Sequence, residues 1–197
     1  MRGEGIDPGR GEGFLGCMLE SPSDSRRILL LRGVNVGGVK LPMAEFRAAL
    51  AELGLKGVKT FIQSGNAVFR TEADALGSIA VVLKARFGLK PELFLFDLPT
   101  FRAILEANPY AEAGQAEGAK VHIFFLSRPA VLDLQGLMAL AEGAEALTVT
   151  DRAIYFNAPN GMGRSLLAEK LGQRLKSGTT ARNQRSAEAI LALAEGL

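Results

Sequence analysis

Short apolar runs alternate with helical repeats of apolar residues along this chain, which predicts a mixed α+β protein. The run from Ile28 to Leu31 is continuous and ends at Arg32, as expected for a buried strand. From Met43 to Leu53, apolar residues recur every three or four positions, which predicts a helix with one buried face. Pro42, just before them, suits the first turn of that helix because its missing N–H costs nothing there.

The rest of the first half predicts two strands of a hairpin, a second helix and a fourth strand. These elements are expected at residues 58–62, 67–70, 76–87 and 93–96. Gly65 and Asn66, at the hairpin tip, are residues that adopt the positive φ angles of a tight turn. A short helix is expected near Phe101–Ala107. The order β-α-β-β-α-β is that of the ferredoxin-like split βαβ unit.

The second half repeats much of this order, and we interpret it as a diverged duplication. Pro129 is expected to open its first helix and Asp151-Arg152 to turn its hairpin. The predicted elements are a strand at 121–126, a helix after 129, strands at 146–149 and 153–156, and helices at 165–175 and 181–195. The predicted fold is therefore α+β, with two ferredoxin-like (βαββαβ-type) subdomains in tandem.

The predicted organisation has three parts. Residues 1–25 are rich in Gly, Ser, Pro and charge and lack periodicity, which favours a flexible N-terminal extension. The first subdomain is expected at residues 26–110 and the second at residues 111–197.

Composition narrows the class of protein. Hydrophobic residues make up 48% and charged residues 22% of the chain, as in globular proteins. No apolar run approaches the roughly 18 residues that span a bilayer, so no membrane partner is predicted. The single cysteine, Cys17, cannot form an internal disulfide, and no signal peptide is evident. We therefore expect a cytoplasmic protein, whose oligomeric state the sequence does not indicate.

The usual groups of acid–base and metal catalysis are scarce. The one histidine, His122, lies inside an apolar run and is interpreted as a packed strand residue. Without a His, Cys or carboxylate cluster or a Gly-x-Ser-x-Gly motif, no metal, no cofactor and no catalytic residue is predicted.

Polar residues in loops are the better candidates for binding. The loop from Arg32 to Gly38 joins a strand to a helix, and its glycines allow backbone N–H groups to converge on an anion. Gln63 and Asn66 place two amide side chains at the hairpin tip, although a plain turn explains both loops equally well.

Further candidates precede the last two predicted helices. Ser165 is a plausible N-cap after Arg164. The segment Ser177–Thr180 is expected to end one helix and cap the next, which would place Arg182 and Asn183 in a first helical turn. An arginine there opposes the helix dipole and hints at another role.

Four segments together resemble the bacterial domain-of-unknown-function 1697 family. They are Leu30–Gly38 (LLRGVNVGG), Thr60–Phe69 (TFIQSGNAVF), Gly163-Arg164-Ser165 and Thr180-Ala181-Arg182-Asn183. The resemblance runs in order from Arg27 to Leu193. It implies two related α+β subdomains and no established activity. Gln184 and Ser186 depart from the family pattern, which favours tryptophan and threonine at these positions.

The resemblance carries over eleven positions as candidate ligand-binding residues. They are Arg32, Asn35, Gly37, Gly38, Gln63, Ser64, Asn66, Arg164, Ser165, Arg182 and Asn183. If the family tryptophan stacks on a base, Gln184 weakens that idea for this chain.

Three hypotheses stay open at this point. The net charge is only +2, but the segment from Arg164 to Arg185 contains six basic residues and one acidic residue. The first hypothesis is a binding protein for nucleic acid or a nucleotide, in which arginines hold phosphates and amides read polar edges. The second is an enzyme acting on a phosphorylated or carboxylated small molecule through electrostatic clamping. The third is a structural or interaction module, in which the motifs cap helices and join the two halves.

Overall fold

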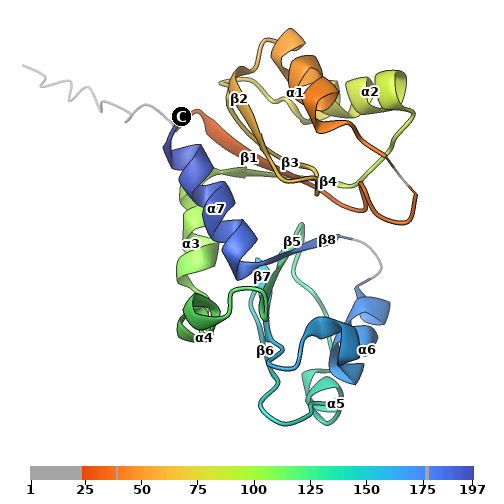
Figure 1. The fold of residues 1–197 in the computed structure, drawn as a ribbon, viewed down its shortest axis with the longest axis vertical. Coiled ribbons are helices and arrows are strands. Elements are labelled where there is room, and N and C mark those ends of the chain that lie inside the picture. The colour runs from red at the N-terminus through yellow and green to blue at the C-terminus, as the bar shows by residue number, and fades with distance from the viewer. Residues whose placement is uncertain (1–23, 39, 176–177) are drawn as a thin grey trace, which may run out of the picture.

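The computed structural model describes residues 24–38, 40–175 and 178–197 (Figure 1). The predicted flexible extension at residues 1–25 falls almost entirely outside this part of the chain, and so does Cys17. Within the described residues, no helix has both the length and the apolar character needed to cross a membrane.

The first half forms a four-stranded antiparallel sheet in the order β2-β3-β1-β4. Its elements are β1 (Arg26–Leu31), α1 (Met43–Glu52), β2 (Lys56–Phe61), β3 (Asn66–Arg70), α2 (Leu76–Phe87) and β4 (Leu93–Asp97). This is the strand order and connectivity of the split βαβ unit.

The second half forms a matching antiparallel sheet in the order β6-β7-β5-β8. Its elements are β5 (Val121–Leu126), α5 (Leu134–Met138), β6 (Ala146–Val149), β7 (Ala153–Asn157), the 3-10 helix η1 (Met162–Arg164), α6 (Leu166–Arg174) and β8 (Thr179–Asn183). The predicted fold class, two tandem βαββαβ-type units, is confirmed.

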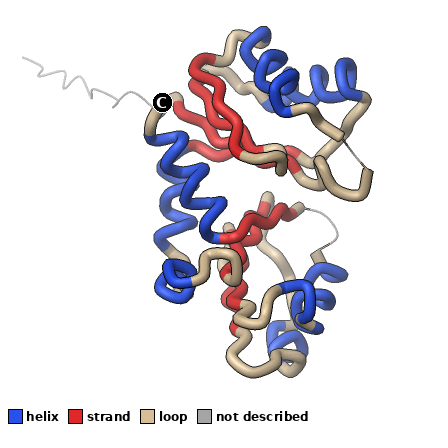
Figure 2. Tube along the Cα trace, viewed as in Figure 1, coloured by secondary structure: helices blue, strands red, loops and turns tan. Residues whose placement is uncertain are grey.

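Three further helices join the two sheets into one structure. They are α3 (Leu98–Glu106), α4 (Ala111–Ala116) and α7 (Gln184–Glu195). Figures 1 and 2 show α3 and α7 side by side along one flank of the molecule, reaching from the upper sheet to the lower one. α1 and α2 cover the other face of the first sheet, and α5 and α6 that of the second (Figure 2).

The hydrophobic core follows from this layering. Side chains alternate between the faces of a strand, so Ile28 and Leu30 enter a core shared by both sheets, α3 and α7. Leu29 and Leu31 enter the core under α1 and α2. The apolar run in β1 forms the buried strand that the sequence predicts, and the structure shows that both of its faces are covered. Leu29, for example, is fully buried.

The last strand was predicted wrongly as part of a helix. Residues 179–183 form β8, which pairs with β5, and helix α7 begins only at Gln184. Arg182 therefore lies on a strand, and Asn183 is the N-cap residue of α7 rather than part of its first turn. Of the predicted capping segment, Ser177 lies outside the described residues. Thr180 and Arg182 are buried by contacts between the two halves, which a local pattern does not reveal.

Smaller corrections concern helix starts and one turn. The helix expected after Pro129 begins at Leu134, because the Asp133 side chain accepts a hydrogen bond from the Gly136 amide and caps it there. Helix α4 was not predicted. At the β2–β3 turn, Gly65 has the expected positive φ of 71°, but the second such residue is Ile62 rather than Asn66.

Candidate functional site

A cavity of about 340 Å³ lies where the two halves of the molecule meet, and we call it the junction pocket. Its walls come from the loop after β1, the β2–β3 turn, the end of α6 and strand β8. The lining residues are Leu31–Val34, Val36, Ser64, Phe124, Gly172, Leu175 and Thr179–Arg182. The pocket thus unites predicted site residues from three separate motifs, Arg32, Ser64 and Arg182.

Arg182 extends from β8 of the second half into the first half. Its Nη2 donates to the backbone oxygens of Leu31 (2.9 Å) and Ser64 (3.0 Å), and its Nε donates to Asn66 Oδ1 (2.6 Å). Its Nη1 donates to Thr180 Oγ1 (2.9 Å) and to the backbone oxygen of Ala181 (2.7 Å). Burial lowers the pKa of Arg182 to about 10, and no carboxylate pairs with it within the described residues.

The Arg32 side chain extends in the opposite direction, from the first half of the molecule into the second. Its Nη1 donates to the backbone oxygen of Thr179 (2.9 Å) and its Nη2 to that of Leu175 (3.1 Å). The Glu92 carboxylate lies 3.7 Å from Nη1 and accepts a hydrogen bond from the Gly178 amide (3.0 Å). The side chain of Glu92 is 42% exposed, so the pocket has no buried carboxylate beside Arg32.

Asn66 and Ser64 supply acceptors that hold the Arg182 side chain in place. Asn66 is fully buried, and its Nδ2 donates to Ser64 Oγ (2.8 Å) and to the backbone oxygen of Phe61 (3.2 Å). These bonds leave Asn66 Oδ1 to accept from Arg182. The two residues therefore position the guanidinium and hold the β2–β3 turn in place.

Asn35 holds the loop after β1 in place. Its side-chain amide is occupied by backbone partners and is not free to bind a ligand. Its Nδ2 donates to the backbone oxygens of Leu41 (3.0 Å) and Gln63 (2.6 Å), and its Oδ1 accepts from the Leu41 amide (2.7 Å). Gln63 contributes its backbone oxygen to this network while its side chain is exposed.

The glycines have different roles. Gly37 and Gly38 have positive φ angles of 58° and 90°, lie in open space and are exposed. Gly65 has no such space, because a Cβ there would lie 2.4 Å from Val34 Cγ2 and 2.8 Å from Leu31 Cβ. The β2–β3 turn can therefore approach the loop after β1 only because residue 65 is glycine.

Of the eleven predicted site residues, only Arg32, Ser64 and Arg182 line the junction pocket, and those of the second half other than Arg182 have different roles. Ser165 Oγ accepts from the Ala168 amide (2.9 Å) and caps α6, and Asn183 Oδ1 accepts from the Ser186 amide (2.9 Å) and caps α7. Arg164 is exposed and lines a separate cavity with residues 162–166, 168 and 169.

Gln184, where the family pattern favours tryptophan, is 2% exposed and packs between α7 and α4. Its Oε1 accepts from Asn108 Nδ2 (2.9 Å), and a Cβ on Gly114 would lie only 1.7 Å from that oxygen. A side chain at this position is enclosed by protein, so it offers no surface on which a base could stack.

The predicted site residues did not include the other polar groups of the junction, which are Thr179 and Thr180 in the pocket wall and Glu92 beside Arg32. Glu92 is a lone acidic residue without a motif. The adjacent β-branched residues Thr179 and Thr180 could have indicated a strand rather than a helix cap.

His122 lies in β5 as expected for a packed strand residue. Burial lowers its pKa, and a hydrogen bond with the backbone of Ala119 opposes that shift. Among residues 24–38, 40–175 and 178–197, no three His, Cys, Asp or Glu side chains are grouped to hold a metal ion.

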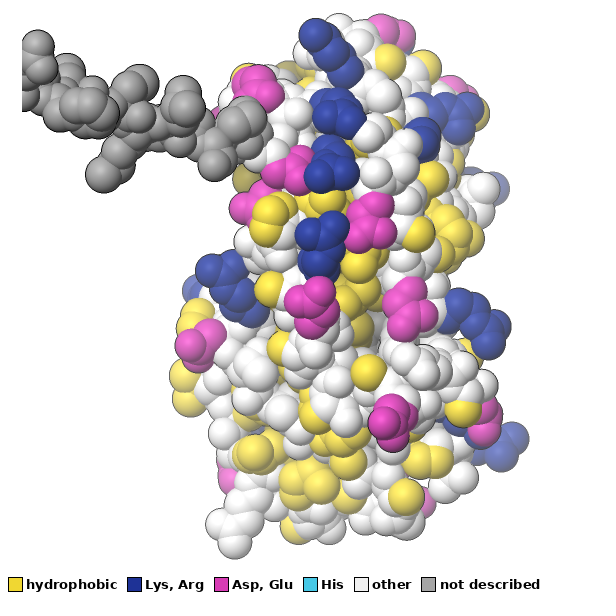
Figure 3. Space-filling view, turned by 90° about the vertical axis from the view of Figure 1, so that its left-hand side faces the viewer, with side chains coloured by type: hydrophobic (Ala, Val, Ile, Leu, Met, Phe, Trp, Pro, Cys, Tyr) yellow, Lys and Arg dark blue, Asp and Glu magenta, His cyan; other side chains and the backbone are white. Residues whose placement is uncertain are grey.

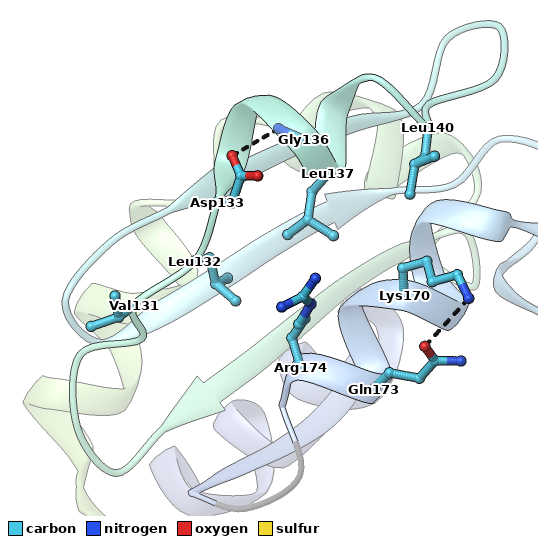
Figure 4. A pocket seen from close by; sticks show the side chains of 9 residues that line it. All are labelled: Val131, Leu132, Asp133, Gly136, Leu137, Leu140, Lys170, Gln173 and Arg174. Carbon is cyan, nitrogen blue, oxygen red and sulfur yellow. Dashed lines mark hydrogen bonds between the residues drawn. The ribbon is translucent and has the colours of Figure 1, made fainter.

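A second cavity, of about 380 Å³, lies between α5 and α6 (Figure 4). The Arg174 guanidinium points into it beneath Leu132 and Leu137, while Asp133 turns away to bond the Gly136 amide. Lys170 is bonded to Gln173 (3.4 Å). The cavity contains none of the motif residues.

The surface charge is mixed on the face shown in Figure 3. A row of Lys and Arg side chains runs down its upper half, with Asp and Glu side chains directly beside it. Basic residues near the end of α7 are already engaged, since Lys59 Nζ donates to the Gly196 oxygen (3.0 Å) and Arg102 pairs with Glu195 (2.9 Å). This face is therefore a weaker candidate for an anion site than the junction pocket.

Comparison with known proteins supports the fold and leaves the activity open. The solved structure of SP0830, a conserved bacterial protein from Streptococcus pneumoniae, is similar to this chain with a TM-score of 0.64 and 24% sequence identity. The alignment covers 86% of this chain and 98% of that chain, and at this identity it shows the fold alone. No curated protein matches the sequence.

The sequence also matches a family model directly. The model described as "Protein of unknown function (DUF1697)" matches residues 25–155, which include β1 to β6 with Arg32 and Asn66. The family resemblance is confirmed, with the motifs at residues 30–38 and 60–69 inside the match, and this chain belongs to the DUF1697 family.

Proposed function

We propose that this protein binds a phosphate-bearing ligand of nucleotide size in the junction pocket. The observation that carries the proposal is the charge of the pocket wall, since the lining residues include Arg32 and Arg182 and no Asp or Glu. Two cationic side chains facing one cavity favour a negatively charged occupant.

Arg32 is the arginine that contacts the ligand in this proposal. A guanidinium carries five N–H donors, and Arg32 uses two of them, on the oxygens of Thr179 and Leu175. Its side chain is 31% exposed, so the remaining donors can reach a phosphate. Arg182 contributes charge and holds the wall, because its own donors are occupied by protein acceptors.

The size of the pocket favours a nucleotide over a nucleic acid. About 340 Å³ is at the lower end of the range for small-molecule sites. Arg164, which a long polyanion would be expected to use as well, lies at a different cavity. The cytoplasm, expected from the sequence, is the compartment in which we place this binding.

The structure also supports a second role for Arg32 and Arg182, which is to hold the two halves of the molecule together. Arg32 and Arg182 each donate to backbone oxygens of the opposite half, at positions more than 140 residues away. This exchange favours an additional role in joining the two sheets. A catalytic role has no comparable support, because the carboxylate beside Arg32 is exposed.

Calorimetric titration with AMP, ADP, ATP and a short single-stranded oligonucleotide, at low and at high salt, tests the proposal. Replacing Arg32 by Ala should weaken nucleotide binding about tenfold or more, because one charge-assisted hydrogen bond contributes about 1.5–3 kcal/mol. Arg86→Ala is the matched control, since Arg86 pairs with Glu52 on the outer helices. Absence of nucleotide binding at low salt would refute the proposal, and binding of the oligonucleotide alone would favour a nucleic-acid partner.

A further inference from the structure

Strand β8 is an edge strand, and its open edge lies against the junction pocket. It pairs with β5 on one side only, and four consecutive residues, Thr179–Arg182, line the pocket. The Ser127 amide donates to the Gly178 oxygen (3.0 Å), which fixes the alternation of the ladder. The Gly178 oxygen and the backbone groups of Thr180 and Arg182 are directed toward β5, whereas the Gly178 amide bonds to Glu92. The backbone groups of Thr179 and Ala181 therefore point outward.

The outward carbonyl groups of this edge are already occupied. Arg32 donates to the Thr179 oxygen (2.9 Å) and Arg182 to the Ala181 oxygen (2.7 Å). The outward amides of the same two residues have no hydrogen-bond partner within the described residues. At this edge the amide donors are free to bind a ligand, whereas the carbonyl acceptors are already hydrogen-bonded to arginine side chains.

This asymmetry decides the kind of ligand. A peptide strand that extends a sheet must donate to edge carbonyls as well as accept from edge amides, and here two guanidinium groups block the carbonyls. A ligand that only accepts, such as a phosphate or carboxylate, meets no such block. The Thr179 hydroxyl, buried in the same wall, also has no partner among the described residues, and a bound ligand would supply one.

The two free amides are spaced along the strand. Residues two apart in a strand lie about 7 Å from each other, so the amides of Thr179 and Ala181 cannot both bind one phosphate. Each amide has a guanidinium beside it, since Arg32 bonds the carbonyl of Thr179 and Arg182 that of Ala181. The wall thus presents two donor positions, each next to a positive charge.

We infer that the ligand of the junction pocket carries two separated phosphate groups, as a nucleoside 3′,5′-bisphosphate does. One phosphate binds the Thr179 amide and the free donors of Arg32. The other binds the Ala181 amide in the field of Arg182. The nucleoside lies against the apolar wall of Val34, Val36 and Leu175. The inference rests on the proposed nucleotide binding and specifies its ligand class.

A titration series with the wild-type protein tests this inference. Adenosine 3′,5′-bisphosphate should bind at least about tenfold more tightly than AMP, because it gains a second charge-assisted contact. ADP, whose phosphates are adjacent, should gain much less over AMP. Equal binding of ADP and the bisphosphate would overturn the inference while nucleotide binding stands. Failure of AMP, ADP and the bisphosphate to bind would overturn the proposed function itself.

A backbone substitution provides a second readout. Proline is tolerated on a strand edge where the N–H points away from the sheet, so Ala181→Pro removes one outward donor and keeps the β5 pairing. This variant should still bind AMP at the Thr179 position. Its affinity for adenosine 3′,5′-bisphosphate should fall close to its affinity for AMP. Retention of the full advantage of the bisphosphate over AMP in a folded variant would contradict the inference, and if the variant does not fold, the wild-type series still decides.

Discussion

The guanidinium of Arg182 and the side-chain amide of Asn66 meet across the junction of the two sheets, with Nε donating to Oδ1 at 2.6 Å. The two residues are 116 positions apart in the chain. Asn66 is fully buried and Arg182 is 9% exposed. Their contact is therefore part of how the second half of the molecule docks on the first, in addition to forming the wall of the junction pocket.

Replacing Arg182 by Ala should lower the free energy of unfolding by about 2–4 kcal/mol, because several buried acceptors lose their donor. The acceptors left without it are the oxygens of Leu31 and Ser64 and Asn66 Oδ1. Arg182→Lys should recover only part of this loss, since an ammonium group cannot reproduce the planar fork. Urea denaturation measures both variants.

Arg86→Ala serves as the comparison for this experiment. Arg86 makes an exposed ion pair with Glu52, and its loss should cost less than about 1 kcal/mol. If Arg182→Ala proved as mild as Arg86→Ala, the arginine would not be a major contact between the two halves.

Gly65→Ala should destabilise the protein more than Gly37→Ala does. Both residues have positive φ angles, 71° and 58°, so both substitutions strain the backbone by about 1–2 kcal/mol. Only at Gly65 would the new Cβ also clash with Val34 and Leu31, whereas Gly37 lies in open space. Thermal unfolding of the two variants tests this ranking, and equal losses would show that the β2–β3 turn does not depend on the close approach.

His122 should make the protein less stable as the pH falls. Burial lowers its folded-state pKa below the ordinary value of 6.5, so the unfolded chain takes up a proton first and is favoured as the pH drops through 6.5. The stability contributed by the neutral imidazole is thus present above that pH and lost below it. His122→Gln removes this dependence because the chain has one histidine.

The measurement is the difference in free energy of unfolding between wild type and His122→Gln at several pH values. The difference should shift against the wild type between about pH 7 and pH 5, where a histidine titrates. A difference that stays constant, or shifts toward the wild type, would contradict the direction of the pKa shift.

Ser165→Ala should affect stability and leave ligand binding unchanged. Loss of its N-cap bond to the Ala168 amide should cost about 1 kcal/mol. Because Ser165 lies outside the junction pocket, titration with a nucleotide should give the wild-type affinity. Weaker binding by a stably folded Ser165→Ala protein would return Ser165 to the ligand site that the sequence had suggested.

Most of the fold could be predicted because its strands and helices contain regularly spaced apolar residues that form the core. The strand at Ile28–Leu31 and the helix face from Met43 show their burial in the sequence itself. Strand β8 could not be predicted in this way, because Ala181 is its single apolar residue. Its burial comes from Arg182 and Thr180 bonding to the first half, and contacts over such long separations leave no local pattern.

The candidate site was predictable in part for a similar reason. Arg32, Ser64, Asn66 and Arg182 stand in sequence motifs that resemble the family pattern, and the fold brings them together. Ser165 and Asn183 stand in the same motifs, yet in the structure they cap helices. A motif alone does not separate a capping residue from a binding residue, because both use the same polar side chains. The outward amides of β8 belong to the backbone, and no side-chain pattern could have indicated them.

The most direct test of the account is an amide chemical-shift titration of the labelled protein with adenosine 3′,5′-bisphosphate. We predict that the largest shifts fall on the backbone amides of Thr179 and Ala181 and on the Nε–H of Arg32. Shifts centred instead on Arg164 or on the α5–α6 cavity, or no shifts at all, would contradict it.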